Sequence, residues 1–157
     1  MPSRLKKILE TNKIQQVKLR SPVLIPPGTQ LTQVLNLMQA KKRGCAIIES
    51  KGHIIGIFTE RDLLTRVVEP QKPLTTKIDD VMTPNPVSLK LTSSIAEAVL
   101  LMSKKGYRHV PLLDDEGIIK GFVSVRDILD YLAEHFPYEV YNQPPDPNQI
   151  SRSAEGA

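Results

Sequence analysis

The chain is poor in cysteine and aromatic residues, and it lacks a long apolar run. Its single cysteine, Cys45, allows no disulfide within the chain and fits a reducing compartment. Cys45 opens the apolar run "CAII" with no histidine beside it, which predicts a buried strand thiol rather than a nucleophile. No apolar run reaches the ~18–20 residues of a membrane-spanning helix, and the N-terminus has no apolar core typical of a signal peptide. We therefore expect a cytoplasmic protein without a membrane partner.

Charge of one sign is also not gathered in one place. Lys and Arg number 21 against 17 Asp and Glu, which gives a formal net charge of +4. Nucleic-acid-binding proteins usually combine a clustered basic face with stacking aromatics, but here aromatics make up 4% of the residues. Segments such as "AKKRG" and "SKKGYR" favour solvated helix faces, so nucleic-acid binding is the weaker alternative.

The chemistry of an enzyme is missing as well. The sequence contains no nucleophile with a neighbouring base and no P-loop. The acidic pairs at Asp79 and Asp114 have no His or Cys beside them, which argues against a metal site. We expect no catalytic residues, no metal and no cofactor.

What the chain does contain is an internal repeat. The segment "CAIIESKGHIIGIFTERDLL" (45–64) matches "VPLLDDEGIIKGFVSVRDIL" (110–129) without a gap, at a constant spacing of 65 residues. Upstream, Pro22-Val23 matches Pro86-Val87 at a spacing of 64 residues. Because a repeat on this scale organises most of the chain, it sets the order of the elements.

Each copy predicts a short strand, a helix, a hairpin and a second helix. "LTQVLNLM" and "SIAEAVLLM" carry apolar residues at helical spacing, with Thr29 and Ser93 as candidate N-caps. Apolar runs on both sides of a Gly-bearing turn predict a hairpin, and the last helices should begin near Glu60 and Val125. Blocks of this size hold little core alone. The sequence therefore predicts an α/β (α+β) fold of paired β-α-β-β-α blocks, packed sheet to sheet about a pseudo-two-fold axis.

The repeat also divides the chain. We expect an N-terminal helix in residues 1–16, a first repeat at 17–78 and a second repeat at 79–135. Residues 136–157 contain several prolines, which forbid a continuing helix and predict an extended arm.

The candidate site residues stand where a strand leads into a helix. An ionised Asp at a helix start can accept hydrogen bonds from both hydroxyls of a ribose, and the preceding Thr or Ser can add another. The helix end and a neighbouring Arg can attract phosphate. The alternative is a capping box, in which the hydroxyl and the acid satisfy the backbone, and residue chemistry leaves the two interpretations even. The residues are Thr59, Arg61, Asp62, Ser124, Arg126 and Asp127.

A second group lies at the entry to a strand. "GYRHVP" offers Tyr107, Arg108 and His109 as candidate ligand contacts, and a solvated strand entry is the alternative. At the matching place the first repeat keeps only Arg43. We therefore expect unequal sites, with Asp127 marking the better-equipped one.

The remaining candidates are the short first strands. Val23 and Val87 are candidate ligand contacts there, and ordinary strand entry is about equally well supported. Arg43 could reach a ligand in either site.

The features taken in order resemble a pair of cystathionine-β-synthase-type (CBS) domains, the Bateman module. The resemblance rests on "DVMTPNPVSL", "YRHVPLLDDEG" and the repeated Gly-x-x-[Ser/Thr]-x-Arg-Asp, and it covers about residues 15–135. It implies a non-enzymatic sensor whose regulatory ligand is AMP, ADP, ATP or S-adenosylmethionine, bound between the repeats with adenine against backbone near Val23 and Val87. It also implies a homodimer of CBS pairs and a regulated protein that the sequence does not identify. A ligand-free module for assembly or partner docking is the alternative.

Overall fold

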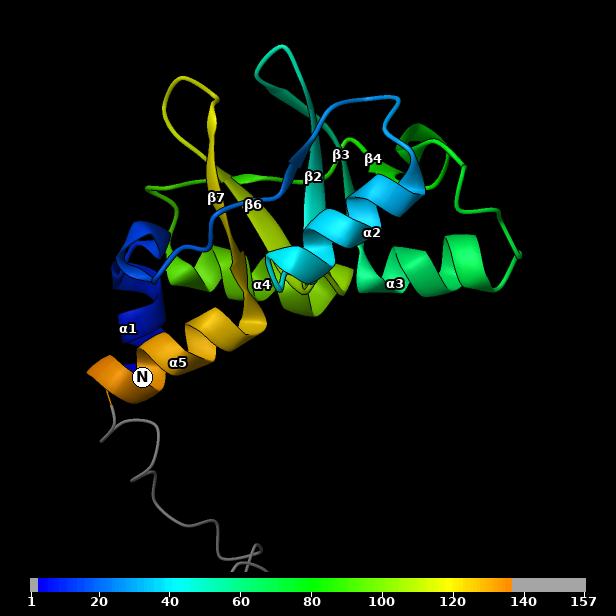
Figure 1. Ribbon diagram of the computed structural model, residues 1–157. Helices are drawn as coiled ribbons and strands as arrows, with labels where there is room; N and C mark the ends of the chain where they lie inside the picture. The colour runs from blue at the N-terminus through cyan, green and yellow to red at the C-terminus, as the bar shows by residue number, and fades with distance from the viewer. Residues whose placement is uncertain (1–2, 137–157) are drawn as a thin grey trace, which may run out of the picture.

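The computed structural model describes residues 3–136, so the predicted arm lies, beyond Phe136, outside the described residues. Two similar halves each contain a small mixed sheet, which confirms the α/β fold expected from the repeat. Figure 1 shows the hairpins of the two halves side by side in the middle of the molecule, with helices around them.

The first half has a four-stranded sheet in the order β1-β2-β3-β4. β1 pairs parallel with β2, whereas β2–β3 and β3–β4 are antiparallel. Its elements are β1 (Leu24–Ile25), α2 (Leu31–Ala40), β2 (Cys45–Ser50), β3 (His53–Thr59), α3 (Glu60–Asp62) with its wider continuation η2 (Leu63–Val68), the short turn η3 (Ile78–Asp80) and β4 (Thr83–Pro84).

The second half repeats the arrangement with a three-stranded sheet in the order β5-β6-β7. β5 is parallel to β6, and β6 is antiparallel to β7. Its elements are β5 (Leu89–Lys90), α4 (Ile95–Lys105), β6 (His109–Leu113), β7 (Ile119–Ser124) and α5 (Val125–His135), together with the N-terminal α1 (Arg4–Thr11) and η1 (Ile14–Gln16).

Each half has its own core, and the N-terminal segment belongs to the second. Ile14 and Val17 are buried among α4, β6 and β7, whereas Ile78 and Val81 are buried in the core of the first half. A small cluster of Cys45, Ile57 and Phe122 joins the two sheets. This cluster adds buried contact between the two halves to the core that each half contains.

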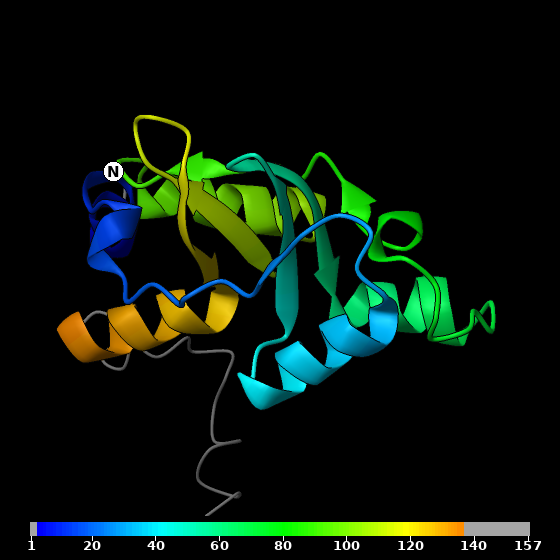
Figure 2. The same cartoon turned by 45° about the horizontal axis from the view of Figure 1, so that its top comes forward.

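Two connectors cross between the halves, and we call residues 17–23 connector 1 and residues 81–87 connector 2. Connector 1 exchanges backbone hydrogen bonds with β7 before it enters β1, through Arg20 and Phe122 at 3.2 and 3.3 Å. Connector 2 pairs with β3 through β4 before it enters β5. Figure 2 shows connector 1 as the blue segment that runs from α1 past the β6–β7 hairpin towards β1.

Glycine is required where connector 1 crosses β7. A Cβ atom on Gly121 would lie 2.9 Å from the carbonyl oxygen of Arg20. The repeated glycine therefore allows the connector to lie close to the strand.

Two helix starts differ from the expectation. The hydroxyl of Thr29 donates to the carbonyl of Pro26, and α2 begins after Gln30, which has no side-chain cap. Ser94, not Ser93, caps α4 by accepting from the backbone N–H of Glu97. The prediction of Thr29 and Ser93 as N-caps was therefore wrong. The hydroxyl of Ser93 instead accepts from the N–H of Lys90.

The N-terminal helix is shorter than expected. Ser3 caps it as its sequence suggests, but it ends at Thr11, and the chain then turns so that the N–H of Ile14 reaches the carbonyl of Ser93. None of the helices in residues 3–136 has the length and apolar character needed to cross a bilayer.

Candidate functional site

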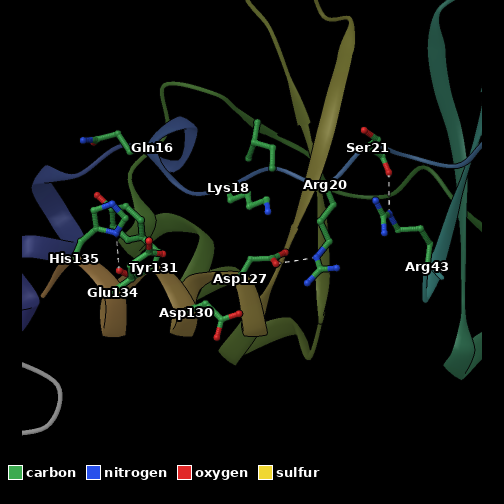
Figure 3. A pocket seen from close by; sticks show the side chains of 11 residues that line it. Gln16, Lys18, Arg20, Ser21, Arg43, Asp127, Asp130, Tyr131, Glu134 and His135 are labelled. Carbon is green, nitrogen blue, oxygen red and sulfur yellow. Dashed lines mark hydrogen bonds and ion pairs between the residues drawn. The ribbon is translucent and has the colours of Figure 1, made fainter. Parts of the chain in front are cut away.

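Two clefts open between the halves, one at each of the repeated helix starts. The Asp127 cleft has a volume of about 910 Å³. Its walls are connector 1, with Lys18, Arg20 and Ser21, and the face of α5 that runs from Asp127 to His135. Arg43 closes the end near Asp127, as Figure 3 shows.

The Asp62 cleft, of about 710 Å³, is the counterpart in the first half. The start of α3, with Thr59, Glu60, Arg61 and Asp62, forms one wall. Thr83 of connector 2 and the segment from Lys105 to His109 form the rest.

Both repeated acids form complete capping boxes. Oδ2 of Asp62 accepts from the backbone N–H and the hydroxyl of Thr59, at 2.9 and 3.1 Å. Oδ2 of Asp127 does the same with Ser124, at 2.9 and 2.8 Å. The capping interpretation is thus correct for one oxygen of each carboxylate.

The other carboxylate oxygen has a different partner in each half. Oδ1 of Asp127 accepts from the Nε of Arg20 at 2.8 Å. Oδ1 of Asp62 accepts from the hydroxyl of Thr83 at 3.0 Å, with the Nε of Arg66 at 3.4 Å. These donors keep both buried carboxylates paired, as burial of a charge requires.

Arg20 and Thr83 occupy equivalent places in the two halves. Arg20 lies opposite Phe122 of β7, and Thr83 lies opposite Ile57 of β3. Phe122 and Ile57 correspond to each other in the 65-residue repeat. The equivalent position therefore carries a cation in one cleft and a neutral hydroxyl in the other.

The residues at the start of each hairpin line the cleft at the helix start of the other half. Tyr107, Arg108 and His109 line the Asp62 cleft, and Arg43 lines the Asp127 cleft. The expected grouping of Arg108 and His109 with Asp127 is wrong, because the start of each hairpin lies beside the helix start of the other half. A Cβ on Gly44 would lie 3.0 Å from Glu60 and 3.6 Å from Nε2 of His109. The starts of the two hairpins therefore lie close to each other at Gly44 and His109.

His109 is an uncharged group in this setting. Burial lowers its pKa from 6.5, although Glu60 and Asp127 act in the opposite direction. Its imidazole is therefore neutral at neutral pH and can donate one hydrogen bond and accept another.

The remaining candidates lie outside the clefts or on their rims. Arg61 lines the Asp62 cleft, but Arg126 is largely exposed and pairs with Asp130 at 3.3 Å. Val23 is buried in the first core, and its carbonyl accepts from the N–H of Ile47. Val87 is 42% exposed, and neither valine is among the lining residues of the clefts.

Several lining residues were missed from the sequence. Arg20 and Lys18 come from connector 1, and Thr83, Lys105 and Arg66 complete the Asp62 cleft. The match of Pro22-Val23 with Pro86-Val87 was the available signal for the two connectors, although its spacing of 64 residues places Arg20 on Pro84 rather than on Thr83. Among residues 3–136, no group of His, Cys, Asp and Glu is arranged to hold a metal ion.

Comparison with protein families gives two matches to the same family, described as CBS domain, at residues 14–69 and 78–134. The CBS domain-containing protein CBSCBSPB1 of Arabidopsis thaliana is 35% identical over 101 residues, which are 64% of this chain and 18% of that protein. An uncharacterised protein of Methanopyrus kandleri, MK0525, is 39% identical over 84 residues, or 53% of this chain and 43% of that protein. The chain thus spans less than half the length of these relatives.

Solved structures share the fold. The CBS domain protein PAE2072 from Pyrobaculum aerophilum, complexed with AMP, superposes with a TM-score of 0.69 at 23% identity, covering 78% of this chain and 98% of that one. The CBS domain pair of protein MJ0100, in complex with 5-methylthioadenosine and S-adenosyl-L-methionine, gives a TM-score of 0.71 at 18% identity, covering 79% and 98%.

Proposed function

This chain belongs to the CBS-domain family, and from that membership and its two clefts we propose that it is a non-enzymatic regulatory module for adenosyl ligands. AMP, ADP and ATP are the proposed ligands, and S-adenosylmethionine is the alternative. The ligand acts as a regulator rather than as a cofactor.

One observation carries the proposal: each cleft contains a buried carboxylate in the first turn of a helix. Asp62 and Asp127 are 7% and 8% exposed, and both line their clefts. The capping box holds one oxygen in place, so the other can accept from a ribose hydroxyl once its present partner moves aside. A fixed acceptor beside a helix N-terminus suits a ribose that carries phosphate.

The cations around the carboxylates support a phosphorylated ligand. Arg108 and Lys105 line the Asp62 cleft, and Arg43 and Lys18 line the Asp127 cleft. Each cleft therefore offers a hydroxyl acceptor and phosphate partners from different halves. A ligand that bridges them would stabilise one arrangement of the halves, which is the requirement for a regulatory switch.

The structural neighbours support the ligand class. Of the two CBS proteins described above, one is complexed with AMP and the other with 5-methylthioadenosine and S-adenosyl-L-methionine. Adenosine is the part that these molecules share, and a carboxylate that reads ribose would accept it in all of them.

We also propose that the module works as a homodimer and acts on a regulated protein. Exposed apolar side chains lie on equivalent helices of both halves, namely Leu64 and Val68 on η2 and Val125 and Leu129 on α5. Each is at least half exposed, which favours an interface with a second copy.

A thermal-shift screen tests the proposed function. Wild-type protein would be melted with AMP, ADP, ATP, NAD, S-adenosylmethionine and no ligand. At least one adenosyl ligand should raise the midpoint in a concentration-dependent way, because a ligand that binds only the folded state stabilises it. Asp115→Ala, in an exposed hairpin turn, is the control and should respond like wild type. A chain that responds to none of these ligands is not the proposed sensor.

A further inference from the structure

The two clefts differ at the oxygen that would read the ribose. We propose that Arg20 is a specificity-determining residue, which makes the Asp127 cleft select phosphorylated over unphosphorylated adenosyl ligands. This inference rests on the proposed function and assigns each cleft its own preference.

The first step is that Arg20 already donates to Oδ1 of Asp127, the oxygen that a ribose hydroxyl would use. The Nε of Arg20 lies 2.8 Å from Oδ1 of Asp127 (Figure 3). The other oxygen of Asp127 is held by Ser124. The Asp127 side chain is 7% exposed, so little of it is open to a ribose while Arg20 is bound. A ribose hydroxyl that binds Oδ1 therefore competes with Arg20.

The second step concerns the ion pair that Arg20 loses when a ribose displaces it from Asp127. Among residues 3–136, Arg20 forms an ion pair with Asp127 alone. An adenosine offers hydroxyls to the carboxylate but no anion to the guanidinium. A nucleotide offers both, because its phosphate can take the guanidinium in the forked geometry that suits Arg. Arg20 is 40% exposed at its side chain, so it can turn towards the cleft without leaving a buried gap.

The third step is that a second cation stands beside it. The guanidinium of Arg43 donates to the carbonyls of Ser21 and Lys41, both at 3.2 Å. Both partners are neutral, so the charge of Arg43 is not neutralised by them. Ser21 is the residue after Arg20, and a phosphate at this end of the cleft would therefore meet both guanidinium groups.

In the Asp62 cleft the donor at the equivalent place is uncharged. Thr83 stands in the place of Arg20 and donates a neutral hydroxyl at 3.0 Å. A hydroxyl can rotate away from Asp62 without separating a pair of charges. Arg66 stays near Asp62 at 3.4 Å, and its terminal nitrogen already donates to the carbonyl of Met82 at 2.8 Å. The preference for phosphorylated over unphosphorylated ligands should thus be smaller in the Asp62 cleft than in the Asp127 cleft.

Calorimetric titration of AMP and adenosine into full-length Asp62→Asn protein tests the inference, because binding then reports the Asp127 cleft. AMP should bind at least about tenfold more tightly than adenosine, the discrimination that one charge-assisted contact commonly supplies. Adding Arg20→Thr, which copies the other half, should reduce the ratio about tenfold. Lys120→Ala is the matched control, since it removes a positive charge from β7 that lies by Asp114 at 3.7 Å. It should leave the ratio unchanged.

The outcomes separate the two proposals. If AMP and adenosine bind and Arg20→Thr leaves their ratio unchanged, the role of Arg20 is overturned and the proposed function stands. If the wild-type chain binds no adenosyl ligand, both proposals fail.

A second measurement uses the wild-type chain and does not depend on how Asp62→Asn folds. The Nε–H signal of Arg20 in a ¹⁵N NMR spectrum can be assigned by its loss in Arg20→Lys. AMP should shift this signal at about tenfold lower concentration than adenosine, because only AMP offers the displaced guanidinium an anion. The same concentration dependence with both ligands, or no shift at saturating AMP, would contradict the inference.

Discussion

His109 lies opposite Ser124 in the ladder between β6 and β7, yet its side chain lines the cleft that contains Asp62. Ser124 caps the helix that begins at the other cleft. The ring of His109 packs on Phe122, with ring centroids 5.6 Å apart, at the contact between the two sheets. A substitution of His109 should therefore alter the packing of both halves.

The first prediction follows from the lowered pKa of His109, which burial lowers from 6.5. The unfolded chain regains the ordinary pKa, so below about 6.5 it binds more protons at this residue than the folded chain does. The free energy of unfolding should therefore decrease as the pH falls through this window, and increase as the pH rises. His109→Gln should flatten the dependence, measured by urea unfolding between pH 7 and pH 5. Identical slopes for both proteins would exclude His109 as the source.

The second prediction concerns the caps. Ser124→Ala and Thr59→Ala each remove a hydroxyl that bonds a buried Asp in both directions. Each should lower the free energy of unfolding by about 1 kcal/mol, the usual cost of losing an N-cap. Ser93→Ala, which is not a cap, is the comparison variant and should cost less. Equal losses at all three positions would argue against the capping boxes.

The third prediction concerns the crossing of connector 1. Gly121→Ala would place a methyl group against the backbone of Arg20, whereas Gly56→Ala would meet the side chain of Met82. A methionine side chain can move, but a paired backbone segment cannot move without loss of its hydrogen bonds. Gly121→Ala should therefore destabilise the protein more than Gly56→Ala in denaturant unfolding. The opposite order would mean that connector 1 is not fixed on β7.

The fourth prediction concerns Cys45, which is fully buried. Burial raises the pKa of its thiol to about 12, despite the opposing charge of Arg43. Thiolate is the reactive form, so native protein at pH 8 should react far more slowly with a disulfide reagent than protein unfolded in urea. Comparable rates in the two states would show that the contact between the sheets opens readily.

Local features of the sequence predicted the elements well. The hairpins and the helix starts at Glu60 and Val125 follow from apolar periodicity and Gly-bearing turns, which act over a few residues. Glu60 and Val125 begin their helices because the preceding Thr59 and Ser124 provide complete caps.

The composition of each cleft depends on contacts between distant parts of the chain. Arg20 meets Asp127 across 107 positions of sequence, and no periodicity signals such a contact. Arg108 and His109 were grouped with Asp127 because they are close to it in sequence. The crossing of the halves instead brings them to Asp62, a physical consequence of joining two sheets at Cys45, Ile57 and Phe122.

Titration calorimetry with AMP, on wild-type protein and on the double variant Asp62→Ala/Asp127→Ala, tests the central claim most directly. Circular dichroism would establish that the double variant is folded. Because both carboxylates would accept ribose hydroxyls, we predict saturable binding to wild type and a loss of at least about tenfold in affinity in the variant. A folded double variant that binds AMP as tightly as wild type would contradict the account.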